Sequence, residues 1–294
     1  MLTTNVKSKE LLLMKKYESL TKRYKDQDPR TIFAYFPYNQ SIGENWEIHY
    51  ERLARMAKTE DWNFKRPEFI LKYENQNYPI LSNYLNYTFL RAQEQDLIVL
   101  SDDGDKACFN TGLMTSRGKD IFATFFKNKQ AESRDQYDWT FYSFVDSYSE
   151  KMQFYKPTPG LATYISDPTD LVFDTSLEID TNIGHMVEKN IDRFPDVLQG
   201  NVKMAENIII GSIQSLKARV KRNYKIAIPH WHEGKIQLLL PLVLTNEDNI
   251  AELALVVDKD KKRNMYRGKT VLSMDLAYID ARLITKPDDD WLNP

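Results

Sequence analysis

The sequence predicts an α+β fold, in which helices pack on a mainly antiparallel mixed sheet that follows an N-terminal helical part. Apolar residues recur at helical spacing in the first third of the chain. From Leu97 onward, short apolar runs alternate with turn signals such as Asp103-Gly104. Helical spacing returns near residues 200–221, and apolar runs then resume. Runs of strands interrupted by helices, without a regular βαβ alternation, indicate this class.

Composition restricts the function classes. The chain has 294 residues and 42% apolar residues, which is enough to bury a core without disulfides. Its formal net charge is −2, so nucleic-acid binding would need a local basic patch. Cys108 is the single cysteine, which excludes an intramolecular disulfide and favours a reducing compartment. No signal peptide and no apolar run of about 20 residues is present, so we expect a cytoplasmic protein without a membrane partner.

Helical spacing predicts several helices. We expect helices over residues 6–26, 45–62 and 79–95, then over 179–194 and 200–221. Pro79 suits the first turn of the third helix. The expected organisation is a helical extension over residues 1–78, followed by one α+β core domain over residues 79–294.

The strands are expected in two blocks, residues 97–174 and 225–272. Short turns between the apolar runs favour antiparallel pairing, so we expect one sheet covered by the 200–221 helix. The last strand is expected at residues 268–273 and is followed by a helix.

The segment FNTGLM, residues 109–114, is the first candidate site. Asparagine and glycine tolerate the left-handed backbone conformation, so Asn110, Thr111 and Gly112 can form a turn that presents backbone amides. Such a turn could hold an anion or a base edge. An ordinary tight turn is the simpler interpretation.

The segment NIGHMVEKNIDRFP, residues 182–195, is the second. His185 and Asn190 could contact a ligand, and Arg193 could bind phosphate as a bidentate donor. A solvated helix face is the structural alternative. His185 and Glu188 form only one His–Glu pair, whereas carboxylate metal sites use two, so no metal is expected here.

The pair His230 and His232 is the third. On a strand both side chains would point to one face, where two imidazoles could perform acid–base chemistry. A third metal ligand is lacking nearby, so we expect no metal. Because Glu233-Gly234 indicates a turn, the favoured interpretation is a pair of histidines in a surface loop.

The last two candidates lie near the C-terminus. Residues 259–269 are basic and include Tyr266, Arg267 and Lys269, which could stack on bases and contact phosphates. A solvated hairpin tip is the alternative. Beyond it, polar residues are embedded in apolar sequence and could form a pocket wall or internal ion pairs. These residues are Asp275, Tyr278, Asp280 and Arg282.

These segments together resemble a bacterial and phage family, domain of unknown function 3825. The resemblance runs from about Asn83 to the C-terminus. It rests on YLNYTFLRAQEQ, FNTGLM, GHMVEKNIDRFP, AIPHW, IQLLLPLVL, LALVV and TVLSMDLAYIDARLI with its WL ending. The resemblance implies association with RNA or nucleotides, since some members accompany OST-HTH (LOTUS) or cold-shock modules. The family pattern favours Asn at Asp280 and often lacks the paired histidines, which weighs against a shared catalytic role for them.

Three functions remain open. The first is an RNA- or nucleotide-binding protein with one site. The residues expected to converge there are Asn110, His185, Arg193, Tyr278 and Arg282. The second is a phosphate-ester hydrolase, a nuclease or nucleotide hydrolase, with His185 or His230 as general acid–base and Arg193 or Arg282 on phosphate. The third is a protein-interaction module. The sequence contains no Walker A, GxSxG or HExxH motif, so it leaves open whether the protein is an enzyme, which cofactor it uses and its oligomeric state.

Overall fold

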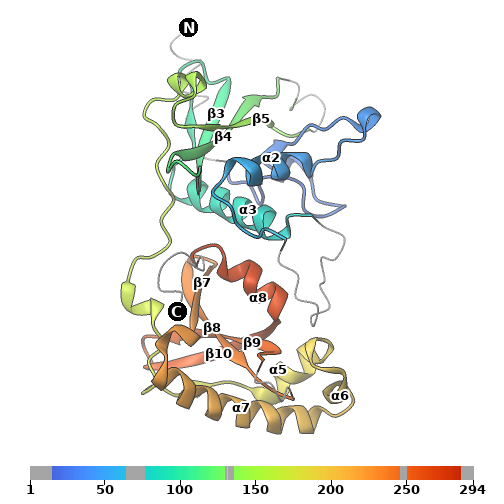
Figure 1. Ribbon diagram of the computed structural model, residues 1–294, viewed down its shortest axis with the longest axis vertical. Coiled ribbons are helices and arrows are strands. Elements are labelled where there is room, and N and C mark those ends of the chain that lie inside the picture. Colours follow the sequence, from blue (N-terminus) through green and yellow to red (C-terminus); the bar gives the residue numbers. More distant parts are fainter. Residues whose placement is uncertain (1–14, 64–76, 130, 132–135, 246–249, 286–294) are drawn as a thin grey trace. The chain divides into compact units, whose positions relative to one another are not determined.

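The chain folds into two compact units, each with its own five-stranded sheet (Figure 1). The computed structural model describes residues 15–63, 77–129, 131, 136–245 and 250–285. The N-terminal unit contains the described residues up to Thr163, and the C-terminal unit contains those from Tyr164. The α+β class is confirmed, but the expectation of a single sheet is wrong. The described residues divide between the two units after Thr163.

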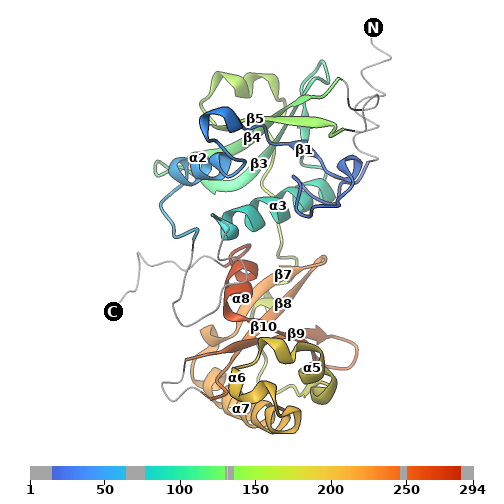
Figure 2. The ribbon, with the colours of Figure 1, turned by 90° about the vertical axis from the view of Figure 1, so that its right-hand side faces the viewer.

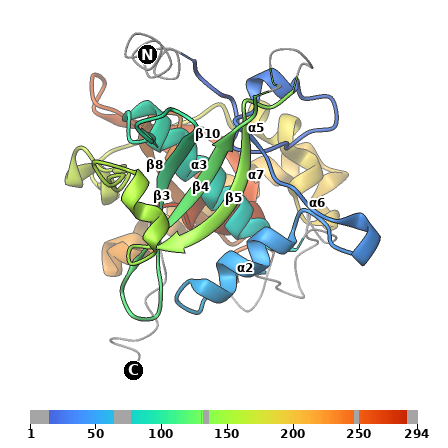
Figure 3. The ribbon, with the colours of Figure 1, turned by 90° about the horizontal axis from the view of Figure 1, so that it is seen from above.

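The sheet of the N-terminal unit has the strand order β1-β5-β4-β3-β2. The strands are β1 (Ala34–Tyr35), β2 (Val99–Leu100), β3 (Lys106–Met114), β4 (Asp120–Lys127) and β5 (Trp139–Asp146). All pairs are antiparallel except β1 with β5. Helix α3 (Pro79–Glu94) lies behind β3 and β4 in Figure 3, and α2 (Ile48–Met56) precedes it. Short 3-10 helices lie at Pro29–Thr31, Gln40–Ile42 and Glu150–Phe154 (η3).

Aromatic rings fill the space between α3 and this sheet. Phe89 of α3 lies 4.7 Å from Phe33 and 5.6 Å from Phe109, measured between ring centroids. Phe109 in turn stacks on Phe125 at 5.9 Å. Side chains alternate along a strand, so the residues next to Phe109 on β3 and next to Phe125 on β4 point to the opposite face of the sheet.

Residues 15–26 do not form the expected helix, and residues 6–14 lie outside the described part of the chain. Ser19 bridges Ile32 in parallel, and the Ser19 carbonyl accepts from the amide of Phe33. The Leu20 amide donates to the Asn86 side chain at 2.9 Å. The backbone groups of this segment form hydrogen bonds with distant parts of the chain and do not need those of a helix. Tertiary packing therefore overrides the helical spacing of its apolar residues.

The sheet of the C-terminal unit has the order β6-β10-β9-β8-β7. Its strands are β6 (Ile179–Asp180), β7 (Ile228–His232), β8 (Lys235–Leu242), β9 (Leu253–Asp260) and β10 (Met265–Ser273). Strands β7 to β10 form an antiparallel meander, and β6 adds in parallel to β10. The end of the first expected strand block forms no strand, because residues 162–165 and 172–174 are irregular and Leu171 ends the 3-10 helix Pro168–Leu171.

Helices cover both faces of this second sheet (Figures 1 and 2). Helices α5 (Ile183–Asn190) and α7 (Val202–Arg222) pack on one face, and the short α6 (Asp196–Gln199) lies beside α7. Helix α8 (Met274–Ala281) packs on the other face through Ala277, against Leu239 and Val256. Burial on both faces explains why β8 and β9 read as continuous apolar runs. Among the described helices, none combines the length and apolar composition needed to cross a bilayer.

We predict that Gly268→Ala destabilises the protein. A Cβ at this position would lie 2.5 Å from Thr181 Oγ1 and 2.6 Å from Thr181 Cβ, so the chain after β6 would have to move. Such overpacking costs roughly 1–3 kcal/mol of unfolding free energy, measurable by chemical denaturation with circular dichroism. Gly211→Ala is the control, because this residue lies in α7 with open space around it. It should be stabilising by about 0.5–1 kcal/mol. Equal effects of the two substitutions would contradict the close packing.

Candidate functional site

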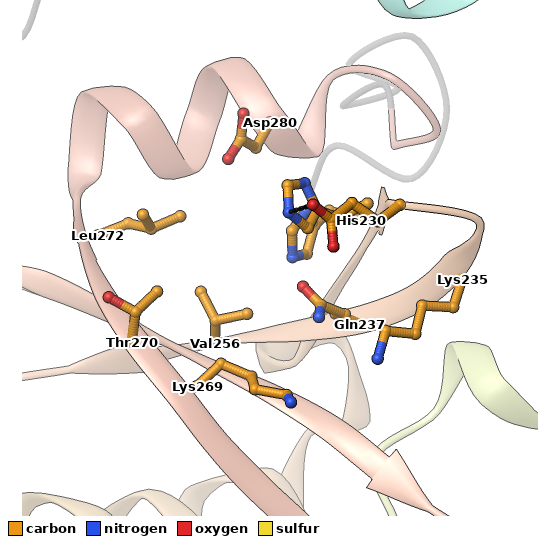
Figure 4. Close-up of a pocket in the computed structure, with 10 residues that line it drawn as sticks. His230, Lys235, Gln237, Val256, Lys269, Thr270, Leu272 and Asp280 are labelled. Atoms are coloured by element: carbon orange, nitrogen blue, oxygen red, sulfur yellow. Dashed lines mark ion pairs between the residues drawn. The ribbon is translucent and has the colours of Figure 1, made fainter. Parts of the chain in front are cut away.

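A cavity of about 260 Å³ opens on the α8 face of the C-terminal sheet (Figure 4). Strands β7 to β10, the β7–β8 turn and α8 all contribute to it. Its lining residues are His230, His232, Glu233, Lys235, Gln237, Val256, Lys269, Thr270, Leu272 and Asp280. They combine two imidazoles, two ammonium groups, two carboxylates and an apolar wall, which makes this cavity the candidate site. It lies wholly within one unit.

Strand geometry places these side chains together. His230 lies opposite Gln237, and His232 lies opposite Lys235, across the β7–β8 hairpin. Alternate residues on a strand point to one face, so all four face α8. A register shift in β10 between Gly268 and Thr270 leaves Lys269 as the extra residue of a bulge. A bulge re-aims side chains, and here both Lys269 and Thr270 line the cavity.

His230 is the most unusual residue of the site. Only 3% of it is exposed, and neither ring nitrogen has a hydrogen-bond partner among the described residues. The pKa of His230 is lowered to about 4, mainly by burial and also by the neighbouring His232, while Gln237 acts in the opposite direction. The imidazole is therefore neutral at pH 7, with one donor and one acceptor that lack a partner among the described residues. A buried polar group left without a partner costs roughly 1–3 kcal/mol, so a ligand that bonds to it gains that much.

His232 lies beside it in a different environment. The two ring centroids are 6.3 Å apart and the ring planes differ by 29°. The His232 Nε2 lies 3.8 Å from the Glu233 carboxylate, and its side chain is 45% exposed. The expectation of two surface-loop histidines is wrong, because both lie in β7 and His230 is buried. The turn that indicated a loop begins only after His232.

The charges of the cavity are asymmetric. Lys235 forms an ion pair with the Asp258 carboxylate, and Lys269 Nζ lies 3.7 Å from the same carboxylate. Two cations therefore share this carboxylate, and both lysine side chains are nearly half exposed. In Figure 4, Val256 and Leu272 form an apolar side of the cavity, and Asp280 faces it from α8. The arrangement suits a ligand that has an apolar part and polar edges.

The described residues contain no group of three His, Cys, Asp or Glu side chains that could hold a metal ion. That His230 and His232 bind no metal stays a prediction from their number.

The FNTGLM segment is a bulge inside β3 of the other unit. The Asn110 side chain accepts from the Gly112 amide at 2.9 Å and donates to Asp120 at 3.3 Å. The Thr111 hydroxyl donates to the Ile121 carbonyl at 2.6 Å. Gly112 has φ +74°, and a Cβ there would lie 2.5 Å from the Tyr84 hydroxyl. These bonds give the segment a structural role, and any ligand contact by it stays a prediction.

The residues proposed on α5 attach this helix to the sheet. The Asn190 side chain donates to the Met186 carbonyl at 2.8 Å and accepts from the Thr270 hydroxyl at 3.1 Å. Arg193 donates to the Val271 carbonyl at 2.5 Å. His185 is exposed at the surface of α5. None of His185, Asn190 and Arg193 lines the cavity.

The C-terminal candidates separate into core and cavity residues. Tyr266 is a core residue, because it is 1% exposed and stacks on Phe173. Its hydroxyl accepts a hydrogen bond from the Asp174 amide at 2.8 Å. Arg267 pairs with Asp260. Asp275 and Arg282 are buried, Tyr278 is half-buried, and none of the three lines the cavity.

Lys269 and Asp280 do line the cavity. Sequence reasoning missed Lys235 and Gln237, although hairpin pairing opposite the histidines would have indicated them.

Comparison with known proteins gives a family and no function. The family described as "Domain of unknown function (DUF3825)" matches residues 53–291, which covers most of both units. No curated protein and no solved structure matches the chain.

We predict that His230 stays neutral down to about pH 5 in the folded protein. Its pKa is lowered from 6.5 to about 4, so between these values the unfolded chain binds the extra proton. The associated stability is fully present above pH 6.5 and is lost as the pH falls through the folded pKa. Unfolding free energy should fall by up to about 1.4 kcal/mol per pH unit from this residue.

Two measurements check this prediction. Proton NMR titration follows the imidazole signal, which is assigned by its loss in His230→Gln. Chemical denaturation of that variant should lack the corresponding part of the acid slope. A His230 ring that titrates at its ordinary value would show that the site is solvated and not buried.

Proposed function

Because the chain belongs to the DUF3825 family, whose description assigns no activity, we propose a function from the cavity itself. We propose that the protein binds a nucleotide, free or as part of an RNA, on the α8 face of its C-terminal sheet. The observation that carries the proposal is the buried His230 imidazole, which opens on the cavity without a hydrogen-bond partner among the described residues.

The neutral imidazole selects the kind of group that binds. It offers one donor and one acceptor, which match a base edge or a ribose hydroxyl better than a phosphate. Val256 and Leu272 supply an apolar surface on which a flat base can lie. Asp280 supplies a carboxylate that accepts from amino or hydroxyl groups.

The lysines supply the complement for phosphate. Lys235 and Lys269 share the Asp258 carboxylate, and Glu233 and Asp280 also line the cavity. Each ammonium has three donors, so both lysines can still donate to an incoming phosphate. The phosphate would have to replace Asp258 as a partner of the lysines and lie away from Glu233 and Asp280.

The size of the cavity limits the ligand. Its volume of about 260 Å³ lies just below the range of roughly 300–1,000 Å³ that is usual for small-molecule sites. It therefore holds about one nucleotide. An RNA would insert a terminal or flipped-out nucleotide, as proteins do when they read an unstacked base.

The histidine pair favours a second candidate, hydrolysis of a phosphate ester. Two imidazoles 6.3 Å apart can flank one reacting phosphorus. Neutral His230 would accept a proton from the attacking water, whose oxygen forms the new bond to phosphorus. His232 would give a proton to the leaving oxygen as its bond to phosphorus breaks, and Lys269 would stabilise the developing charge. His185, Arg193 and Arg282 lie outside the cavity and have no part in this scheme.

We predict that His230→Gln weakens nucleotide binding about tenfold or more. Loss of a buried hydrogen-bonding partner costs roughly 1–3 kcal/mol. Isothermal titration with nucleoside monophosphates and with short RNA measures the affinity. His185→Gln is the matched control, because the same change is made at an exposed histidine outside the cavity. Lys269→Gln should also weaken binding and reduce its salt dependence, whereas Lys262→Gln at the hairpin tip should not. Equal affinities of all four variants would exclude the cavity as the site.

The hydrolase candidate predicts a different pattern. His232→Gln should keep nucleotide affinity within a few-fold while lowering turnover of phosphodiesters by about a hundredfold or more, the usual contribution of general acid–base catalysis. The measurement is product formation from RNA and from nucleotide substrates, with binding determined in parallel. Absence of turnover in a wild-type protein that binds nucleotides would leave binding as the function.

A further inference from the structure

The outer face of the N-terminal sheet carries a group of exposed aromatic and basic side chains. We call it the aromatic–lysine face and define it as Lys106, Phe126, Tyr142, Lys151 and Phe154. Its three rings are 39%, 48% and 44% exposed, in chain order. Large aromatic side chains are usually buried, so a cluster that stays exposed requires an explanation.

Regular structure holds the face in place. Phe126 lies opposite Lys106 across the β3–β4 pair, and its ring centroid is 4.4 Å from that of Tyr142 on β5. Lys151 and Phe154 come from η3. Met152 of η3 and the following Tyr155 pack into a small core with Cys108, Phe122 and Val145 on the same sheet. The exposed rings are therefore presented by strands and a packed turn, and binding would require little ordering.

Lysine ammonium groups lie over the rings. Lys151 Nζ is 4.0 Å from the Tyr142 ring centroid, and Lys106 Nζ is 4.4 Å from that of Phe154. At the other end of β4, Lys119 Nζ is 4.4 Å from the ring of Tyr148. Such contacts occur about once per 70–80 residues, whereas the described residues from 106 to 154 contain three. Two of the three rings of this face therefore have a lysine ammonium group over them.

Lys106 and Lys151 each retain hydrogen-bond donors that a ligand could use. Lys106 lies 3.5 Å from the Asp103 carboxylate, and Lys151 donates to the Ser143 hydroxyl at 3.1 Å. Each of these contacts uses one of three ammonium donors. The Asp103 carboxylate is partly committed elsewhere, since it also accepts from the Ser101 hydroxyl and the Asp105 amide.

We propose that the aromatic–lysine face binds single-stranded nucleic acid. Unpaired bases stack on Phe126, Tyr142 and Phe154, and the adjoining phosphates contact the lysines. Only a single strand exposes base faces and phosphates together. A duplex offers its phosphates but keeps its bases stacked, and it would use the lysines alone. Cations beside the rings would repel the arginine and lysine side chains of a basic protein.

This site is independent of the cavity. It lies in the other unit, shares no residue with the cavity and rests on different observations. It therefore extends the proposed function to a second surface, and each proposal can fail alone.

The test compares a labelled single-stranded oligouridine with a nucleoside monophosphate as ligands of the full chain. The double variant Phe126→Ala/Tyr142→Ala should lose about a hundredfold in oligouridine affinity, since stacking on each of the two rings contributes about tenfold. It should keep wild-type affinity for the monophosphate. Tyr24→Ala is the matched control, because this tyrosine is 70% exposed in the same unit and lies outside the face. Tyr142→Phe keeps a ring and should bind like wild type. Circular dichroism of each variant verifies the fold.

The outcomes are distinct. Unchanged oligouridine affinity in the folded double variant overturns the face as a nucleic-acid site, whatever the cavity does. Equal affinity for duplex and single strand in the wild type also overturns it, because stacking would then have no part. Oligouridine binding that depends on both rings, without monophosphate binding, supports the face and rejects the cavity proposal.

Discussion

The unequal cover of the C-terminal sheet is the constraint on which the site depends. Helix α7 has 21 residues and α8 has eight. At about 1.5 Å per residue they are about 31 Å and 12 Å long, and the eight- and nine-residue strands are about 25–30 Å long. The longer helix can therefore cover the full length of its sheet face, whereas the shorter one cannot. The cavity lies on the face with the short helix, toward the β7–β8 hairpin.

The polar residues on the α8 face also follow from the difference in length between α7 and α8. Near α8, the inward positions of β8 and β9 are apolar, as at Leu239 and Val256. Toward the hairpin the same alternation brings Gln237, Lys235 and the two histidines to this face. His230 is nevertheless buried there. Burial without a hydrogen-bond partner among the described residues distinguishes it from His185, which is exposed to solvent.

Local sequence signals predicted much of the fold. The α3 helix begins at Pro79 as expected, β3 and β4 lie within the first expected block of strands, and the change from strand to helix after Ser273 is confirmed. The division into two sheets was not predictable, because the partner of a strand is set by tertiary packing and not by its own alternation. The two-residue strands β1 and β6 carry too few residues to show any periodicity. The cavity was only partly predicted. His230, Lys269 and Asp280 were chosen from their residue types, whereas the burial of His230 is a result of tertiary packing that its own segment does not indicate.

Internal hydrogen bonds and burial distinguish the candidates better than residue type does. Asn110 and Arg193 looked suited to a ligand, yet the fold uses their polar groups to hold a bulge and to attach a helix. Tyr266 looked suited to stacking on a base, yet it is part of the core. By contrast, the ring nitrogens of His230 have no hydrogen-bond partner among the described residues, and the Tyr142 ring stays 48% exposed although Lys151 and Phe126 contact it. An exposed ring gains little from the hydrophobic effect, and a buried imidazole without a partner reduces stability. The two binding proposals rest on these features, because neither adds to the stability of the fold.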